Sequence, residues 1–253
     1  METLLSRNLS LAAAAFKAAR QLVFPEQCPG CGALMADGNG LCGSCWRETP
    51  FILGLVCDLC GTAQIGPDDG TCVHCDACRA LERPWARGRA VLDYSGGARR
   101  LVLGFKHGDR LDLGPRFARW MAARAGPLLE PGMLIVPVPV HRGRLLRRRY
   151  NQAAVLGRLL GRELNLPHLP DALLRTRATP PMAGDGHAAR AASLEGAIAA
   201  APRHRARLAG RPVLLVDDVM TSGATLSLCA RQLAAAGVPI VNVLVLARAV
   251  QHA

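Results

Sequence analysis

The sequence has few aromatic residues, few lysines and no long uninterrupted apolar segment. Five Phe, three Trp and two Tyr among 253 residues offer few side chains on which nucleic-acid bases could stack. Lys17 and Lys106 are the only lysines, and arginine supplies almost all of the positive charge behind the formal net charge of +12. In an alanine-rich chain, an excess of arginine reflects a GC-rich genome as readily as nucleic-acid binding, so charge alone does not identify a partner.

No segment is long and apolar enough to span a membrane. The apolar run near the amino terminus extends only from Leu9 to Phe16, well short of the ~20 residues that a bilayer requires. A cleavable signal is not expected either, because Lys17 and Arg20 interrupt the region where its cleavage site would fall. We therefore predict a cytoplasmic protein without a transmembrane span, whose residues 1–25 form an amphipathic helix.

Nine of the ten cysteines fall between residues 28 and 78, and their spacing is that of metal ligands. Two C-x2-C pairs separated by ten residues open this segment, as in a four-thiolate zinc site. The predicted ligands are Cys28, Cys31, Cys42 and Cys45. Paired spacing of this kind in a chain without an export signal favours metal binding over disulfide bonds. Cys229 lies outside the segment and is predicted to be a small buried residue.

A second set of thiols predicts a second zinc ion. It begins with Cys57-x2-Cys60, and two of Cys72, Cys75 and Cys78 complete it, because five thiols cannot all bind one tetrahedral ion. Four thiolates close the coordination shell and leave no position for a substrate, so both ions are predicted to be structural. A segment with so few large apolar side chains needs the metal to fold.

Residues 213–225, VLLVDDVMTSGAT, carry the strongest functional signal in the chain. The apolar run Val213–Val216 shows no alternation and predicts a buried parallel strand. Asp217 and Asp218 follow it, and then come a loop rich in hydroxyls and an alanine-rich helix. Such a strand–loop–helix unit binds phosphorylated ligands at the carboxyl end of an open α/β sheet. Two carboxylates there would repel the ligand unless they bind its hydroxyls or a Mg²⁺ ion.

This stretch resembles the phosphoribosyl pyrophosphate (PRPP) signature of type I phosphoribosyltransferases. The resemblance implies that Asp217 and Asp218 bind the ribose hydroxyls and that the loop after them binds the 5′-phosphate. The PRPP-binding segment comprises Val219, Met220, Thr221, Ser222, Gly223, Ala224 and Thr225. The alternative is a loop whose Asp and Thr side chains only cap the next helix. Thirteen consecutive residues that fit one pattern favour the ligand site.

A cysteine-rich module before this signature resembles the ComF family, the competence-protein-F group of bacterial phosphoribosyltransferase-like proteins. The segments CPGCG, LCGSCW, FKHGDR and VPVPVHRGRLLRRRYNQA carry the resemblance, which extends from Pro25 to the end of the chain. In the family, a proline and an aromatic residue follow the last cysteine pair, as Pro84 and Trp85 do here. That match assigns the second zinc ion to Cys57, Cys60, Cys75 and Cys78. Cys72 is then the spare thiol.

The resemblance implies an α/β fold with an open, mainly parallel sheet of the type I phosphoribosyltransferase type, preceded by a small zinc-ribbon module. A chain of this length suits such a module together with an α/β domain. The predicted boundaries are residues 1–25 for the amphipathic helix, 26–86 for a double zinc ribbon and 87–253 for the phosphoribosyltransferase-like domain.

A basic loop, Pro139–Arg149, follows a second predicted strand, Leu134–Val138, and precedes a helix predicted over Tyr150–Leu164. Guanidinium groups bind phosphate oxygens in pairs, and the resemblance implies that this loop clamps the departing pyrophosphate. The arginines predicted to do so are Arg142, Arg144, Arg148 and Arg149, with Arg147 beside them. The same loop suits nucleic acid equally well.

Lys106 is assigned to catalysis together with the two aspartates. It lies in FKHGDR, which is predicted as a turn between a strand, Arg89–Tyr94, and a helix, Leu113–Arg124. The bias of a GC-rich genome toward arginine would have replaced a lysine that has no function. In the family, this lysine lies at the site. The alternative is an ordinary surface lysine. The loop Arg175–Gly186 is predicted to be a mobile hood that closes over the ligand.

Three positions differ from related proteins and limit the ligands and substrates to be expected. Met182 and Ser193 stand where family members usually carry Gln and Asn, so any contacts made by those polar groups are missing here. Thr221 stands where phosphoribosyltransferases of 6-oxopurines carry an aspartate that exchanges a proton with the base. This difference argues against that class of substrate.

Three functional hypotheses follow. The first is a Mg²⁺-dependent transferase that moves ribose 5-phosphate from PRPP to an unidentified acceptor. The second is a competence protein that assists uptake of single-stranded DNA together with a helicase-like partner, as ComF relatives are associated with doing. The third is a sensor that binds PRPP or a nucleotide without turnover. The resemblance also allows a homodimer, since type I relatives are commonly dimers.

Overall fold

The computed structural model describes residues 25–35, 40–107, 110–141, 143, 145, 150–177 and 196–249. The chain divides into two compact units, residues 1–48 and 49–253. Of the amphipathic helix predicted over residues 1–25, all but the last residue lie outside these ranges. Within them, no helix has both the length and the apolar character needed to cross a bilayer.

The described part of the first unit is built around the first set of cysteines. A bridge between Gln27 and Leu34 closes a tight turn, in which the amide of Gly32 donates to the carbonyl of Cys28 at 2.8 Å. Helix α2, Gly43–Glu48, follows and buries Cys45. The turn and the helix together bring the two C-x2-C pairs to one place.

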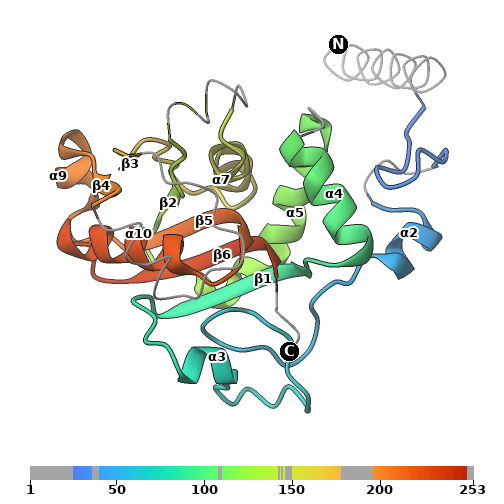
Figure 1. Cartoon of the computed structure of the whole chain (residues 1–253), viewed down its shortest axis with the longest axis horizontal. Helices are drawn as coiled ribbons and strands as arrows, with labels where there is room; N and C mark the ends of the chain where they lie inside the picture. Colours follow the sequence, from blue (N-terminus) through green and yellow to red (C-terminus); the bar gives the residue numbers. More distant parts are fainter. Residues whose placement is uncertain are drawn as a thin grey trace, which may run out of the picture. The chain divides into compact units, whose positions relative to one another are not determined.

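Four parallel strands form the main sheet of the second unit, in the order β1-β6-β5-β2 (Figure 1). These are β1 (Arg87–Asp93), β2 (Leu134–Pro137), β5 (Val213–Met220) and β6 (Val241–Arg248). β5 and β6 consist almost wholly of buried residues, as expected of strands covered on both faces. The predicted fold class, an open parallel α/β sheet preceded by a zinc-ribbon module, is confirmed. Because β5 pairs with β2, the loops after these two strands leave the same edge of the sheet.

Helices cover both faces of this sheet. The main ones are α4 (Gly96–His107), α5 (Gly114–Ala125), α7 (Gln152–Glu163) and α10 (Ala224–Ala235). α5 and α7 pack on each other and on the sheet, while α10 packs on β5 and β6. Cys229 of α10 is buried, as predicted, in a core shared with Val213 and Leu215 of β5. Side chains alternate along a strand, so Asp217 lies on the α10 face and Asp218 on the opposite face.

A small antiparallel sheet and several short helices complete the second unit. β3 (Leu173–Arg175) pairs with β4 (Ile198–Ala200), and β4 packs against α10. The short helices are α3 (Asp76–Arg79), η1 (Leu111–Leu113), η2 (Gly126–Leu128), η3 (Pro202–His204) and α9 (Arg205–Leu208).

The expected elements agree with the observed ones to within two residues at each end, with two exceptions. The strand predicted over Val213–Val216 continues to Met220, because Val219 and Met220 stay paired with β6. FKHGDR was predicted as a turn, but Phe105, Lys106 and His107 form the last turn of α4. The prediction was wrong because Gly96, Gly97 and Gly104 obscured the helical pattern. The buried residues of α4, Ala98, Leu101, Val102 and Phe105, nonetheless recur at helical spacing.

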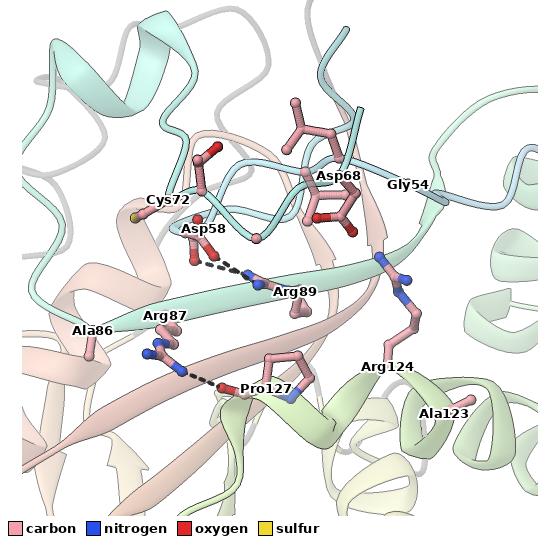
Figure 2. A pocket seen from close by; sticks show the side chains of 14 residues that line it. Gly54, Asp58, Asp68, Cys72, Ala86, Arg87, Arg89, Ala123, Arg124 and Pro127 are labelled. Carbon is pink, nitrogen blue, oxygen red and sulfur yellow. Dashed lines mark hydrogen bonds and ion pairs between the residues drawn. The ribbon is translucent and has the colours of Figure 1, made fainter. Parts of the chain in front are cut away.

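The second set of cysteines belongs to the second unit, where its loops lie against β1 (Figure 2). The amide of Gly88 in β1 donates to the carbonyl of Asp58 at 2.6 Å, and Arg89 Nη2 contacts Asp58 Oδ1 at 2.8 Å. A Cβ on Gly88 would lie 2.2 Å from the carbonyl oxygen of Leu59, so only glycine permits this approach. The second ribbon, which is the segment that carries Cys57, Cys60, Cys75 and Cys78, is therefore packed directly on the sheet.

Residues 50–52 cover the outer edge of β1. The amide of Ile52 donates to the carbonyl of Val91 at 2.9 Å, and that of Asp93 donates to Pro50 at 2.9 Å. A sheet edge covered in this way cannot pair with another chain. The boundary between ribbon and domain after residue 86 stays a prediction.

Candidate functional site

The candidate site lies at the carboxyl end of β5, in the centre of the sheet. Asp217 and Asp218 fall in the last half of this strand, and Gly223 is the N-cap of α10. Gly223 has a φ of 80°, a backbone conformation that favours glycine. The predicted strand, loop and helix are therefore all present, and the residues between them surround the start of a helix, where anions are favoured.

Asp218 pairs with Lys106, which confirms that these two residues from distant segments meet. Lys106 Nζ lies 3.1 Å from Asp218 Oδ1, and the two side chains are 18% and 13% exposed. An ion pair shielded to this degree from water is held in a definite geometry. Lys106 therefore lies beside Asp218, although it comes from the end of a helix and not from a turn. Its assignment to catalysis stays a prediction.

The start of α7 holds Lys106 in place. Gln152, which is buried, donates from Nε2 to the carbonyl of Lys106 at 3.1 Å, and the hydroxyl of Tyr150 donates to the carbonyl of Phe105 at 3.1 Å. Both bonds satisfy carbonyls at the carboxyl end of α4, where intrahelical partners are missing. In the sequence, the YNQ segment is notable only as part of the family resemblance, whereas these contacts show that it supports the end of α4.

Asp217 experiences a different environment from its neighbour. Burial, followed by the charge of Asp218, raises its pKa to about 8, although Lys106 and Arg175 act in the opposite direction. The amide of Asp218 donates to Asp217 Oδ1 at 2.8 Å. The site therefore holds one carboxylate that is paired and one that keeps its proton near neutral pH until a cation or a hydrogen-bond donor approaches.

Two buried arginines contact the backbone of the loop between β5 and α10. Arg83 Nη1 donates to the carbonyl of Ser222 at 2.8 Å, and Arg248 Nη1 donates to the carbonyls of Met220 at 3.2 Å and Thr221 at 2.5 Å. Sequence reasoning missed both residues. Arg83 follows the last cysteine of the second ribbon and Arg248 ends β6, so neither lies near the loop in sequence.

The arginines predicted for the pyrophosphate loop, Arg142, Arg144, Arg148 and Arg149, lie outside the described residues, as does Arg147. The start of their loop is described: the amide of Val138 donates to Val216 at 2.9 Å, and Asn151 Nδ2 donates to the carbonyl of Val138 at 3.1 Å. The basic loop thus begins next to Asp217. Residues 178–186 of the predicted hood, together with Met182 and Ser193, also lie outside the described ranges.

The cysteines form two tetrads. In each, the four sulfurs lie within 4.8 Å of one another, and no member is in a disulfide bond. A tetrahedral zinc ion with Zn–S bonds of ~2.3 Å needs sulfurs that are roughly 3.8 Å apart, so both sets fit the ion. The members are Cys28, Cys31, Cys42 and Cys45, and Cys57, Cys60, Cys75 and Cys78. Cys72 is exposed and stands apart, as the family resemblance implied.

A pocket of about 480 Å³ lies elsewhere, between the second ribbon, β1 and the end of α5 (Figure 2). None of the residues predicted to bind ligand lines it. Among its charged groups, Arg89 pairs with Asp58, and Arg87 donates a hydrogen bond to the carbonyl of Pro127 at 3.0 Å. Asp68 and Arg124 also line the pocket. The Arg89–Asp58 contact belongs to the docking of the ribbon.

Comparisons with known proteins agree with this organisation. The model of the double zinc ribbon domain family matches residues 19–80. Competence protein F of Haemophilus influenzae is 30% identical over 233 residues, which cover 89% of this chain and 98% of that protein. DNA utilization protein YhgH of Escherichia coli is also 30% identical over 233 residues, which cover 90% of this chain and 99% of that protein.

Two solved structures show a more distant likeness. One is the glutamine PRPP amidotransferase from B. subtilis, with 16% identity, a TM-score of 0.38 and coverage of 57% of this chain and 30% of that chain. The other is the hypoxanthine phosphoribosyltransferase from Trypanosoma cruzi, with 20% identity, a TM-score of 0.32 and coverage of 55% and 66%. This chain thus spans less than two thirds of either solved chain.

Proposed function

The chain belongs to the competence protein F family, and on that premise we propose that it binds PRPP or a related phosphoribosyl ligand, with Mg²⁺, at the carboxyl end of β5. The observation that supports this most directly is the cluster of Asp217, Asp218 and Lys106 beside a glycine-containing loop at a helix start. The carboxylates can accept hydrogen bonds from ribose hydroxyls, and the loop can bind a phosphate. The carboxylates and the loop together therefore suit a phosphorylated sugar better than either does alone.

Each part of the ligand has a counterpart in the chain. The 5′-phosphate would bind the segment Val219–Thr225, whose loop amides and hydroxyls precede α10. The ribose hydroxyls would donate to the carboxylates of Asp217 and Asp218. The pyrophosphate group, with its high negative charge, would lie toward Lys106 and the basic loop that carries Arg142, Arg144, Arg148 and Arg149.

Magnesium fits the donors present. Carboxylate oxygens are the ligands that Mg²⁺ prefers, and Asp217 and Asp218 would hold the ion directly or through water. When bound, the ion would offset the charge of the pyrophosphate group. A nearby cation would also lower the pKa of Asp217, which burial and Asp218 raise in the free protein.

The proposed reaction is transfer of ribose 5-phosphate. The bond between C1 and the pyrophosphate oxygen breaks, pyrophosphate leaves with the electron pair, and the acceptor forms a bond to C1 and loses a proton. The carboxylates would stabilise the positive charge that develops near C1, and Lys106 with the arginines would stabilise the leaving group. Thr221 in the loop supplies no acid to exchange a proton with a base, which speaks against a 6-oxopurine acceptor.

Calorimetric titration of PRPP with Mg²⁺ tests this proposal. We expect binding by the zinc-loaded wild type and none by the double variant Asp217→Asn/Asp218→Asn. Asp76→Asn, which removes a fully exposed carboxylate on α3, is the matched control and should bind like wild type. Absence of binding by folded wild type, or equal binding by the double variant, would contradict the proposal. If binding is found, pyrophosphate release identifies the acceptor and separates a transferase from a sensor that only binds.

A role in DNA uptake or utilisation is the second proposal, because the relatives are named for competence and for DNA utilization. The positive net charge suits single-stranded DNA, and Trp46, 50% exposed, offers a surface for base stacking. Fluorescence anisotropy with a labelled oligonucleotide should show binding that weakens with salt and in Trp46→Ala. Salt-independent binding, or no effect of Trp46→Ala, would count against contact through the first ribbon. A helicase-like partner, a homodimer and cytoplasmic localisation stay proposals.

A further inference from the structure

Arg83 lies between the second zinc site and the loop that we assign to the phosphate. Arg83 is only 8% exposed, and its Nη1 donates to the carbonyl of Ser222 at 2.8 Å. A Cβ on Gly223 would lie 2.7 Å from the same Nη1. The glycine of the loop therefore leaves the space that this guanidinium occupies.

The same guanidinium also contacts the ribbon. Its guanidinium lies over the ring of Trp85 at 5.3 Å, and Trp85 Nε1 donates at 2.7 Å to the carbonyl of Leu59, which stands between two zinc ligands. The ribbon itself is fixed to β1 by Asp58 (Figure 2). Arg83 thus connects the ribbon to the loop.

The hydrogen bonds to the loop orient its amides. Arg83 and Arg248 together hold three successive carbonyls, those of Met220, Thr221 and Ser222. No peptide in the described part of the chain is cis, so each N–H points away from its carbonyl and hence away from the arginines. Successive N–H groups that point to one side form an anion-binding concavity.

Both arginines also bring positive charge beneath the loop. Within the described ranges neither forms an ion pair with a carboxylate, and the Nε atom of each is buried without a hydrogen-bond partner there. A buried guanidinium without a carboxylate partner is costly, and an anion on the far side of the loop would offset part of that cost.

We propose that Arg83 is a positioning residue through which the second zinc ribbon holds the phosphate loop in its ligand-binding form. Ligand affinity then depends on zinc at the second site and not on zinc at the first. The statement about affinity rests on the proposed function, whereas the statement about the loop does not.

Hydrogen–deuterium exchange of peptides that contain residues 221–225 tests the loop without any ligand. Loss of a charge-assisted hydrogen bond should raise local exchange by about tenfold or more in Arg83→Met. Arg79→Met removes an exposed arginine of the same ribbon and is the matched control, with wild-type exchange expected. If Arg83→Met fails to fold, Arg83→Lys keeps the charge but not the planar fork, and it should show the same rise. Wild-type exchange in a folded Arg83 variant would overturn the proposal.

Zinc removal supplies the second test. Cys31→Ser should lose one zinc ion and leave exchange at residues 221–225 and PRPP affinity unchanged. Cys75→Ser should lose the other ion, raise exchange in the loop and lower PRPP affinity by about tenfold or more, as Arg83→Met should. A Cys75→Ser chain that stays folded with a wild-type loop would overturn the coupling. If wild type binds no PRPP, the proposed ligand is wrong, and the exchange measurements still decide the role of Arg83.

Discussion

Asp217 and Asp218 are adjacent in sequence, but the sheet turns them to opposite faces, and their replacement by asparagine should shift stability in opposite directions. Asp217→Asn removes a carboxyl group whose pKa burial and Asp218 raise from an ordinary 3.8 to about 8. The asparagine keeps an oxygen that can accept the hydrogen bond from the amide of Asp218. We therefore expect this variant to be more stable than wild type.

The size of the effect follows from proton linkage. Between the unfolded pKa and the folded pKa, the folded chain binds the Asp217 proton and the unfolded chain does not, so this group makes wild type less stable as pH rises from about 4 to 8. At pH 7 the cost is at most ~4 kcal/mol, at ~1.36 kcal/mol for each pH unit above the ordinary pKa. Asp217 keeps partial contact with solvent and an attraction to Arg175, so we expect about half of this, ~2 kcal/mol.

Asp218→Asn should do the reverse. It leaves the Lys106 ammonium, only 18% exposed, without the carboxylate that now lies 3.1 Å away. Breaking a fully buried pair costs roughly 3–5 kcal/mol, and partial exposure reduces the expected loss to ~1–3 kcal/mol. For a unit of this size, that is a fall in Tm of about 2–4 °C for each kcal/mol.

Urea unfolding at pH 5, 6.5 and 8, followed by tryptophan fluorescence, measures both effects. A Trp46→Phe background confines the signal to Trp85 and Trp120 of the second unit. The advantage of Asp217→Asn over wild type should grow between pH 5 and pH 8, while Asp218→Asn should be less stable at pH 6.5 and 8. A gain in stability for Asp217→Asn that is absent at every pH, or that does not change with pH, would show that folding does not raise the pKa of Asp217.

Three further predictions concern the metal, the loop and the support of Lys106. Metal analysis of protein purified without chelator should give about two zinc ions per chain, and a value below one would contradict the tetrads. In Cys31→Ser the zinc content should fall to about one ion per chain. Limited proteolysis of this variant should then cleave the first unit and leave the second unit intact. Gly223→Ala should lower the free energy of unfolding by ~1–2 kcal/mol, because its φ is positive and the added Cβ meets Arg83; an unchanged urea midpoint would contradict this. Gln152→Leu should lower the free energy of unfolding by ~1–2 kcal/mol, because it leaves the Lys106 carbonyl without its hydrogen-bond donor. It should also weaken PRPP binding, as measured by calorimetry. Full affinity would show that this bond does not position Lys106.

Features that depend on neighbours in sequence could be predicted from the sequence. The run Val213–Val216, the acids and the small residues of the loop each have local preferences that agree, so β5, the loop and α10 form where expected. Paired cysteines bind one ion from a short stretch of chain. Their spacing therefore identified the tetrads, because all four ligands of each lie close together in sequence. The end of α4 was missed because its glycines weaken the local helical signal while burial of Phe105 and Leu101 stabilises the helix.

What the amino-acid sequence determined by itself is therefore the chemistry available: thiols spaced for zinc, and two acids before a phosphate-type loop. The tertiary structure alone decided which of these groups meet. Arg83 and Ser222 are 139 residues apart, and no local pattern relates them. The alternation of β5 gives Asp218 the pairing with Lys106 and leaves Asp217 on the face covered by α10. Such contacts arise from the packing of whole elements, whose energies are spread over many residues and leave no signature at the positions that finally touch.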